Sequence, residues 1–109
     1  MKVIIAGTGA MACLFGAKLA PHADVTLLGT WAEGVEAIRA RGILVEDGSG
    51  NYLPSSEGRG CRVHATTDPA DCAGTDAARV LVKAWQTERA AEQLAQCLSP
   101  NGVALTLQN

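Results

Sequence analysis

The feature that most constrains the fold is an apolar run followed at once by a glycine-rich turn and a helical pattern. Residues 3–6, Val-Ile-Ile-Ala, are typical of a strand buried on both faces of a parallel sheet. The next residues, Gly7-Thr8-Gly9-Ala10-Met11-Ala12, have the pattern G-x-G-x-x-A. Apolar residues then recur at helical spacing as far as Leu19, and a second apolar run at 25–28 predicts another strand. The chain therefore begins with a predicted strand–helix–strand unit.

Each small residue of this turn has a mechanical role in dinucleotide binding. Gly7 makes the tight turn off the strand, Gly9 lets the backbone approach a pyrophosphate, and Ala12 lets the helix lie close to the sheet. The pyrophosphate would lie against the helix N-terminus, where N–H groups and the helix dipole favour anions. A chain rich in glycine and alanine matches this pattern readily by chance, so its position between strand and helix is what indicates binding. The alternative is a turn that only connects a strand to a helix.

The rest of the chain alternates in the same way. Trp31, Val35 and Ile38 stand at helical spacing in a segment that ends at Gly42. Residues 43–46 and 51–53 flank the turn Asp47-Gly48-Ser49-Gly50 and predict an antiparallel hairpin at one edge of the sheet. The loop 58–60 and a short extended piece at 61–65 follow.

The second half repeats the alternation. A short helical turn is predicted from Asp68-Pro69 to about Ala73, followed by a strand at 79–83. Thr87 is the expected N-cap of a helix whose apolar stripe is Ala91, Leu94 and Leu98. A turn at 99–102 and a last strand at 103–107 complete the order. The prediction is one α/β domain over residues 1–109, a Rossmann-type doubly wound parallel sheet with an antiparallel edge hairpin.

Composition and charge exclude several classes of protein. The chain has 109 residues, of which 48% are hydrophobic, and this is enough to form a hydrophobic core. Its net charge of -2 gives no electrostatic reason to bind nucleic acid or an anionic membrane. The four cysteines form no C-x-x-C pair, and no metal-ligand spacing appears. The uncharged run 3–17 superficially resembles a signal peptide, but it is too short to span a membrane and glycines interrupt it. We expect a soluble cytoplasmic protein without a metal.

The residues after the second strand bear on cofactor choice. NAD-preferring sites usually place an acid about 20 residues past the glycines, where it accepts from the ribose 2′-OH. Here the strand ends in Leu28-Gly29-Thr30-Trp31, without an acid, which favours NADP. No arginine follows the strand either, and Arg39 and Arg41 are interpreted as solvated charges at the end of the helix.

Two further polar residues follow predicted strands. Lys83 opens Lys83-Ala84-Trp85-Gln86 after the strand at 79–83, and Asn109 follows the last strand. Ligands of open α/β sheets bind outside the carboxyl ends of strands, so Lys83 would reach a ribose hydroxyl or the substrate. The alternative is a solvated lysine. Trp85 is interpreted as a packing residue, and His22 and His64 as loop or surface histidines without a partner.

These residues together resemble the N-terminal half of the ketopantoate reductases (2-dehydropantoate 2-reductases). The resemblance rests on residues 1–11, Met-Lys-Val-Ile-Ile-Ala-Gly-Thr-Gly-Ala-Met, on Lys83-Ala84-Trp85-Gln86, and on Leu107-Gln108-Asn109. It implies that the glycine loop binds NADPH and that Lys83 and Asn109 lie near the nicotinamide ribose and the substrate. The family's usual arginine for the 2′-phosphate corresponds to Thr30. The implied cofactor-binding residues are Gly7, Thr8, Gly9, Ala10, Met11, Ala12, Thr30, Lys83 and Asn109, of which Lys83 and Asn109 would also bind substrate.

The resemblance also implies an activity that this segment does not carry alone. The family continues after the asparagine with Gly-x-Gly and a helical second domain, which contains the lysine proton donor and a substrate-binding carboxylate. No catalytic residue is therefore expected within residues 1–109, and the segment alone is expected to be inactive. The complete enzyme would reduce the C2 carbonyl of a 2-oxo acid, ketopantoate in pantothenate biosynthesis, and a homodimer is the assembly to test. Two alternatives stay open: a non-catalytic nucleotide-sensing regulatory domain, and another two-domain hydroxy-acid dehydrogenase.

Overall fold

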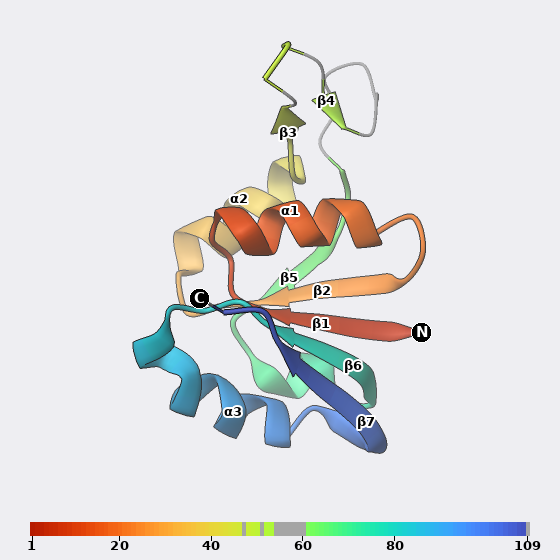
Figure 1. The fold of residues 1–109 in the computed structure, drawn as a ribbon, viewed down its shortest axis with the longest axis vertical. Coiled ribbons are helices and arrows are strands. Elements are labelled where there is room, and N and C mark those ends of the chain that lie inside the picture. Colours follow the sequence, from red (N-terminus) through yellow and green to blue (C-terminus); the bar gives the residue numbers. More distant parts are fainter. Residues whose placement is uncertain (47, 51, 54–60, 109) are drawn as a thin grey trace.

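The computed structural model describes residues 1–46, 48–50, 52–53 and 61–108, and its centre is a five-stranded parallel sheet. The sheet order is β5-β2-β1-β6-β7 (Figure 1). The strands are β1 (Lys2–Ala6), β2 (Asp24–Leu28), β5 (His64–Thr66), β6 (Thr75–Val80) and β7 (Leu98–Thr106). Because β2 and β5 lie on one side of β1 while β6 and β7 lie on the other, the direction of winding reverses between β1 and β6.

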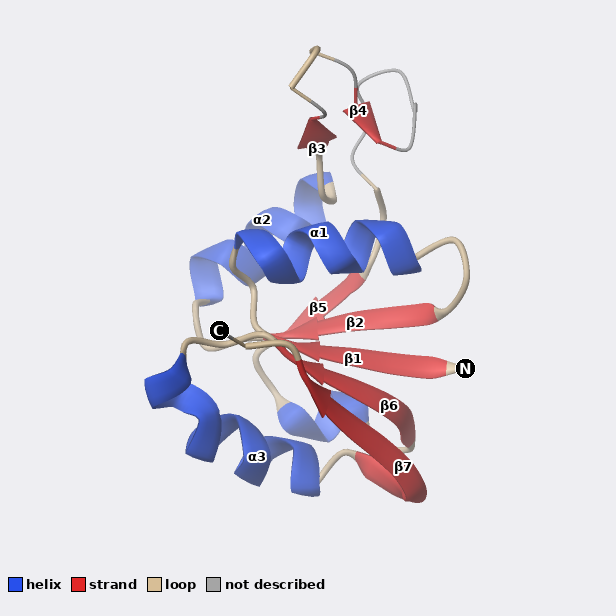
Figure 2. Cartoon of the chain, viewed as in Figure 1, coloured by secondary structure: helices blue, strands red, loops and turns tan. Residues whose placement is uncertain are grey.

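Helices cover both faces of this sheet, as the prediction of a doubly wound fold requires (Figure 2). The helices α1 (Ala10–Leu19) and α2 (Ala32–Arg41) lie on one face. The opposite face carries α3 (Thr87–Ala95) and the short 3₁₀ turn η1 (Pro69–Cys72), and a second 3₁₀ turn, η2 (Ala84–Gln86), leads into α3. The α/β class and the Rossmann-type architecture are confirmed.

The first strand is buried on both faces, as its β-branched sequence predicts. Ile5 packs with Val25 and Leu27 into the core under α1 and α2. Ile4 and Ala6 point the other way, into the core under α3. All four residues of 3–6 are at most 5% exposed, so β1 is the centre of the molecule.

The helix α1 approaches the sheet through its small residues. Its buried residues are Ala12, Gly16 and Ala17, while Met11 is 54% exposed. A Cβ at Gly16 would lie 3.0 Å from Leu27 Cδ1, so glycine at this position allows the close approach. The closeness matters for the site, because it fixes the N-terminus of α1 against the end of β1.

The predicted edge hairpin is wrong in its placement. The strands β3 (Val45–Glu46) and β4 (Tyr52–Leu53) do pair antiparallel, but they form a separate two-stranded sheet that stands away from the main one (Figure 1). The edge of the main sheet is β5, which is parallel to β2. The physical reason is that α2 is the crossover connection between β2 and β5, and a strand that follows a crossover helix pairs parallel to the strand before it. The hairpin is therefore an insertion within that crossover. The predicted loop 58–60 lies outside the described residues.

Three boundaries in the second half also differ from the predictions. The strand expected at 79–83 is β6, which begins at Thr75 and ends at Val80. The expected turn at 99–102 lies inside β7, where the register jumps five positions along β7 against two along β6. Thr87 is the first residue of α3 rather than its N-cap, and its hydroxyl donates to the Ala84 carbonyl. In each case strand pairing or backbone hydrogen bonding overrides the local turn and cap preferences.

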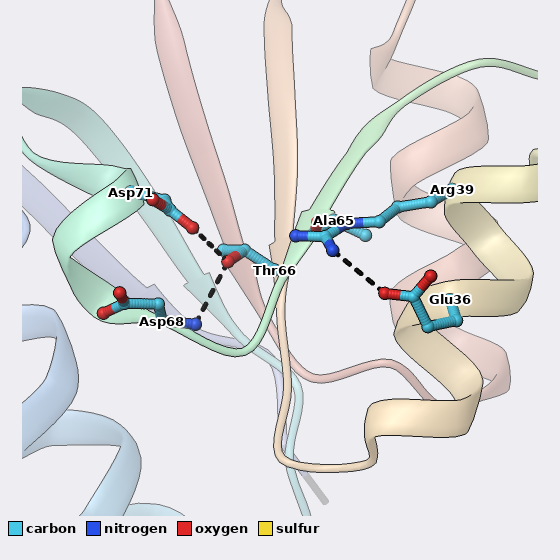
Figure 3. Close-up of polar contacts among 6 residues, drawn as sticks. All are labelled: Glu36, Arg39, Ala65, Thr66, Asp68 and Asp71. Carbon is cyan, nitrogen blue, oxygen red and sulfur yellow. Dashed lines mark hydrogen bonds and ion pairs between the residues drawn. The ribbon is translucent and has the colours of Figure 1, made fainter.

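The edge strand β5 is held by polar contacts at its outer side and at its end (Figure 3). Arg39 of α2 donates from Nε to the Ala65 carbonyl at 2.7 Å and pairs with Glu36 at 3.0 Å. The buried Thr66 hydroxyl donates to Asp71 and accepts from the Asp68 N–H, which turns the chain into η1. These contacts satisfy groups that an edge strand would otherwise leave unpaired.

Candidate functional site

A pocket of about 500 Å³ opens at the carboxyl ends of the strands, where the winding reverses. One side is formed by the turn after β1 and by the residues after β2, and the other side by the residues after β6 and β7. This is the position where open α/β sheets bind their ligands. We call it the carboxyl-end pocket.

The glycine turn forms the floor of the pocket, and its first glycine is required by the backbone. Gly7 has φ +134°, a conformation that side chains rarely adopt, and its N–H donates to the Leu28 carbonyl at 2.8 Å. A Cβ there would lie 3.3 Å from the Leu81 carbonyl oxygen. Gly7 therefore lets the ends of β1, β2 and β6 meet.

Neither the backbone conformation nor the packing of the protein requires glycine at the second position of the turn, Gly9. Gly9 has φ -78°, which any residue adopts, and a Cβ there would meet no atom within 4 Å. The open space above Gly9 belongs to the pocket. Gly9 is also the N-cap of α1, no side chain caps the first turn, and that turn contains no acid. The first N–H groups of a ten-residue helix are thus available to an anion.

The β2 end of the pocket carries a hydroxyl and an aromatic ring. Gly29 lies against Thr8, because a Cβ at Gly29 would fall 2.5 Å from the Thr8 side chain. Thr30 is exposed at the end of β2. Trp31 is the N-cap of α2 and is 61% exposed, so the expectation that it belongs to the helix's apolar stripe is wrong. Val35 and Ile38 form the buried part of that stripe.

The β6 end of the pocket carries the charges. Lys83 and Arg89 line it, and Arg89 donates to the Gln93 side chain at 2.8 Å. Gln108 closes this end, since its Nε2 donates to the Val82 carbonyl at 3.0 Å and to the Thr87 hydroxyl at 2.7 Å. The amide of Gln108 therefore ties the segment after β7 to the segment after β6 and to α3.

Most of the predicted site residues converge on this pocket. Gly7, Thr8, Gly9, Ala10, Met11, Thr30 and Lys83 line it. Ala12 is 1% exposed and lies behind the turn. Its Cβ would be 3.5 Å from a Cβ placed on Gly7, which agrees with the packing role predicted for Ala12. Asn109 lies outside the described residues. Trp85 is 81% exposed and is not a lining residue, so its interpretation as a packing residue is wrong.

The lining residues that were not predicted as site residues include Trp31, Arg89 and Gln108. Trp31 directly follows Thr30 at the end of a strand, which is a usable signal. Arg89 lies two residues into α3 and Gln108 just past β7, and only the folded arrangement brings both to Lys83.

A larger hollow of about 790 Å³ lies at the other end of the sheet, near the amino ends of β1, β2 and β5. Its charged lining residues are already engaged. His64 pairs with Asp24 at 3.4 Å, which corrects the expectation that this histidine has no partner. The Arg62 guanidinium donates to the carbonyls of Arg39 and Ala40, and Lys2 Nζ donates to the Ala73 carbonyl. We therefore take the carboxyl-end pocket as the candidate site.

The cysteines lie outside the pocket and are free thiols. Cys72 and Cys97 are buried, and Cys13 and Cys61 are half-buried. Burial raises the pKa of all four thiols, that of Cys72 to about 12. Among the described residues no three His, Cys, Asp or Glu side chains group to hold a metal ion, and no helix has the length and apolar character to cross a membrane.

Comparisons with known proteins agree on one family. The family model described as "Ketopantoate reductase PanE/ApbA" matches residues 3–109. A 2-dehydropantoate 2-reductase of Halobacterium salinarum is 36% identical over the whole chain, which covers 34% of that protein. The crystal structure of a PanE/ApbA family ketopantoate reductase from Ralstonia eutropha superimposes with a TM-score of 0.82 at 33% identity, over 100% of this chain and 34% of that one.

A second kind of enzyme shares the fold. D-mandelate dehydrogenase in complex with NADH superimposes with a TM-score of 0.70 at 25% identity, over 100% of this chain and 31% of that one. The chain thus spans about a third of the length of the proteins it resembles.

Proposed function

The chain belongs to the ketopantoate reductase family of oxidoreductases, and from that premise we propose that its carboxyl-end pocket binds NADPH. The observation that carries the proposal is the unfilled space over Gly9 at the uncapped N-terminus of α1. A pyrophosphate needs such a close approach to backbone N–H groups. The residues present therefore fit a dinucleotide.

Each lining segment has a role in this proposal. The turn from Gly7 to Met11 holds the pyrophosphate, and the residues after β2 face the adenosine half. Lys83, at the β6 end, faces the nicotinamide ribose and the substrate, and the family resemblance assigns the same role to Asn109. Lys83 orients the substrate carbonyl or carboxylate through its ammonium group.

The reaction proposed for the complete protein is reduction of the C2 carbonyl of a 2-oxo acid, ketopantoate in pantothenate biosynthesis. The bound dinucleotide supplies a hydride. The residues of this chain hold and orient the reactants, and a lysine in a helical second domain protonates the developing alkoxide. The segment described here would then bind the cofactor and turn over nothing alone. The four free thiols support a reducing compartment such as the cytoplasm.

Calorimetric titration with NADPH and with NADH tests the cofactor assignment. Because no acid follows β2, nothing there repels a 2′-phosphate, and we expect NADPH to bind more tightly than NADH. Equal affinity or a preference for NADH would refute the choice of NADPH. Failure of both to bind would refute the binding function itself.

The structural similarity to D-mandelate dehydrogenase supports a second candidate function for the complete protein, that of a dehydrogenase acting on other 2-hydroxy acids. The two candidates differ in the side chain of the acid and share the chemistry at C2. Steady-state rates of the full-length enzyme with ketopantoate and with an aryl 2-oxo acid separate them. A higher kcat/KM for ketopantoate supports the reductase.

A further inference from the structure

Trp31 is an exposed aromatic residue that lines the carboxyl-end pocket. It follows Thr30 at the end of β2, it is the N-cap of α2, and it is 61% exposed. An exposed aromatic ring that lines a pocket offers a flat apolar surface to a ligand bound there.

The ring is held in place by the helix behind it. A Cβ at Gly34 would collide with the indole, and two of the ring atoms, Cδ2 and Cζ3, would lie only 2.8 Å from it. Gly34 is itself buried. Glycine at this position thus lets the benzene half of the indole rest on the first turn of α2. The platform is fixed on one side and open on the other.

The chemistry around Trp31 leaves it as the main recognition group at its end of the pocket. The cationic side chains that line the pocket, Lys83 and Arg89, both come from the segment after β6. At the β2 end the neighbours are Gly29, buried, and the exposed hydroxyl residue Thr30. A flat aromatic ring that is open to the pocket binds a flat aromatic base by stacking.

We infer that Trp31 is the stacking platform for the adenine ring of the dinucleotide. This inference rests on the proposed function, since the pyrophosphate over Gly9 and the sheet topology direct the adenosine half toward the end of β2. Trp31 supplies affinity for any adenine-containing ligand, whether or not it carries a 2′-phosphate. In this inference Trp31 binds the adenine ring, and Thr30 determines whether the site prefers a ribose 2′-hydroxyl or a 2′-phosphate.

The chain contains a matched control in its second tryptophan. Trp85 is 81% exposed and is not a lining residue. Replacing either tryptophan removes an exposed indole. A difference in ligand affinity between the two variants therefore reports a contact between the ligand and Trp31.

The experiment is calorimetric titration of Trp31→Ala, Trp31→Phe and Trp85→Ala with NADPH, ADP-ribose and nicotinamide mononucleotide. We expect Trp31→Ala to weaken NADPH and ADP-ribose about tenfold, and to leave the mononucleotide unchanged. Trp31→Phe keeps a planar ring and should recover most of the loss. Trp85→Ala should bind all three ligands as the unchanged chain does. Circular dichroism checks that each variant is folded.

Fluorescence gives a readout independent of affinity. In the Trp85→Phe chain the only indole is Trp31, and ADP-ribose should quench it, whereas Trp85 in the Trp31→Phe chain should not respond. If Trp31→Ala binds ADP-ribose normally while the unchanged chain binds NADPH, the stacking role is overturned and the proposed function stands. If the unchanged chain binds neither ligand, both fail together.

Discussion

The two ends of the carboxyl-end pocket offer a ligand different chemistry. At the β2 end the polar and aromatic side chains are those of Thr30 and Trp31, and at the β6 end they include Lys83 and Arg89. Between them lies the glycine turn, which offers backbone N–H groups. The contrast indicates that charge is recognised at the turn and at the β6 end, and shape at the β2 end. Changes at each position should therefore have effects of different size and kind.

The largest effect is expected at the turn that both ends share. Gly9→Val places a branched side chain in the space that a pyrophosphate would fill, and we expect NADPH affinity to fall at least about a hundredfold, or about 3 kcal/mol. Because a Cβ at Gly9 meets no protein atom, the expected cost is that of replacing a glycine N-cap by valine, and the free energy of unfolding should fall by no more than about 1 kcal/mol. Calorimetry and urea unfolding measure the two quantities. Ala104→Val, at an exposed position of β7, is the control and should bind normally.

A neighbouring glycine should behave in the opposite way. Gly7→Ala forces a side chain into a backbone with φ +134° and against the Leu81 carbonyl, and we expect unfolding free energy to fall by about 2 kcal/mol. Urea unfolding of the apo-protein checks this. An unchanged midpoint would show that Gly7 is not what joins the strand ends.

The β2 end should become selective when it is given a charge. Thr30→Arg adds a guanidinium at an exposed position without a neighbouring lining cation, and we expect the ratio of NADPH to NADH affinity to rise about tenfold. Affinity for NADH serves as the internal control and should change little. A ratio that stays constant would mean that the 2′-phosphate does not lie beside residue 30.

The smallest effect is expected for the charge at the β6 end. Lys83 is exposed to water, so Lys83→Met should weaken both dinucleotides about threefold, and by the same factor, because it lies far from the 2′ position. Lys18→Met, an exposed lysine of α1 that does not line the pocket, is the matched control. In the full-length enzyme the larger consequence of Lys83→Met should appear in kcat. Titration and steady-state kinetics separate the two, and a selective loss of NADPH alone would argue against this placement.

Local patterns predicted the turn and the central strand because their causes are local. The run 3–6 has the residues of a doubly buried strand, and the glycines follow it directly, so the βα turn and its buried partner Ala12 could be located from the sequence. The positions of Thr30 and Lys83 followed from the rule that strands present their carboxyl ends together.

Other features depend on tertiary pairing that no local pattern carries. The residues Ser-Pro-Asn-Gly at 99–102 have strong turn preferences, yet pairing with β6 extends β7 through them. The hairpin was recognised but misplaced, since its position depends on the crossover to β5. Trp31 matched a helical stripe, but α2 begins one residue later, and the ring turns outward over Gly34. Arg89 and Gln108 reach the pocket only through the packing of α3 and β7.

The location of the dinucleotide is the central claim, and an NMR titration of the ¹⁵N-labelled chain with NADPH tests it most directly. We predict shifts of the amide signals from Gly7 to Met11, at Thr30 and around Lys83, and a shift of the Trp31 indole signal but not of the Trp85 indole. Shifts concentrated instead on Lys2, Asp24 and His64, in the hollow at the amino ends of the strands, would contradict the account.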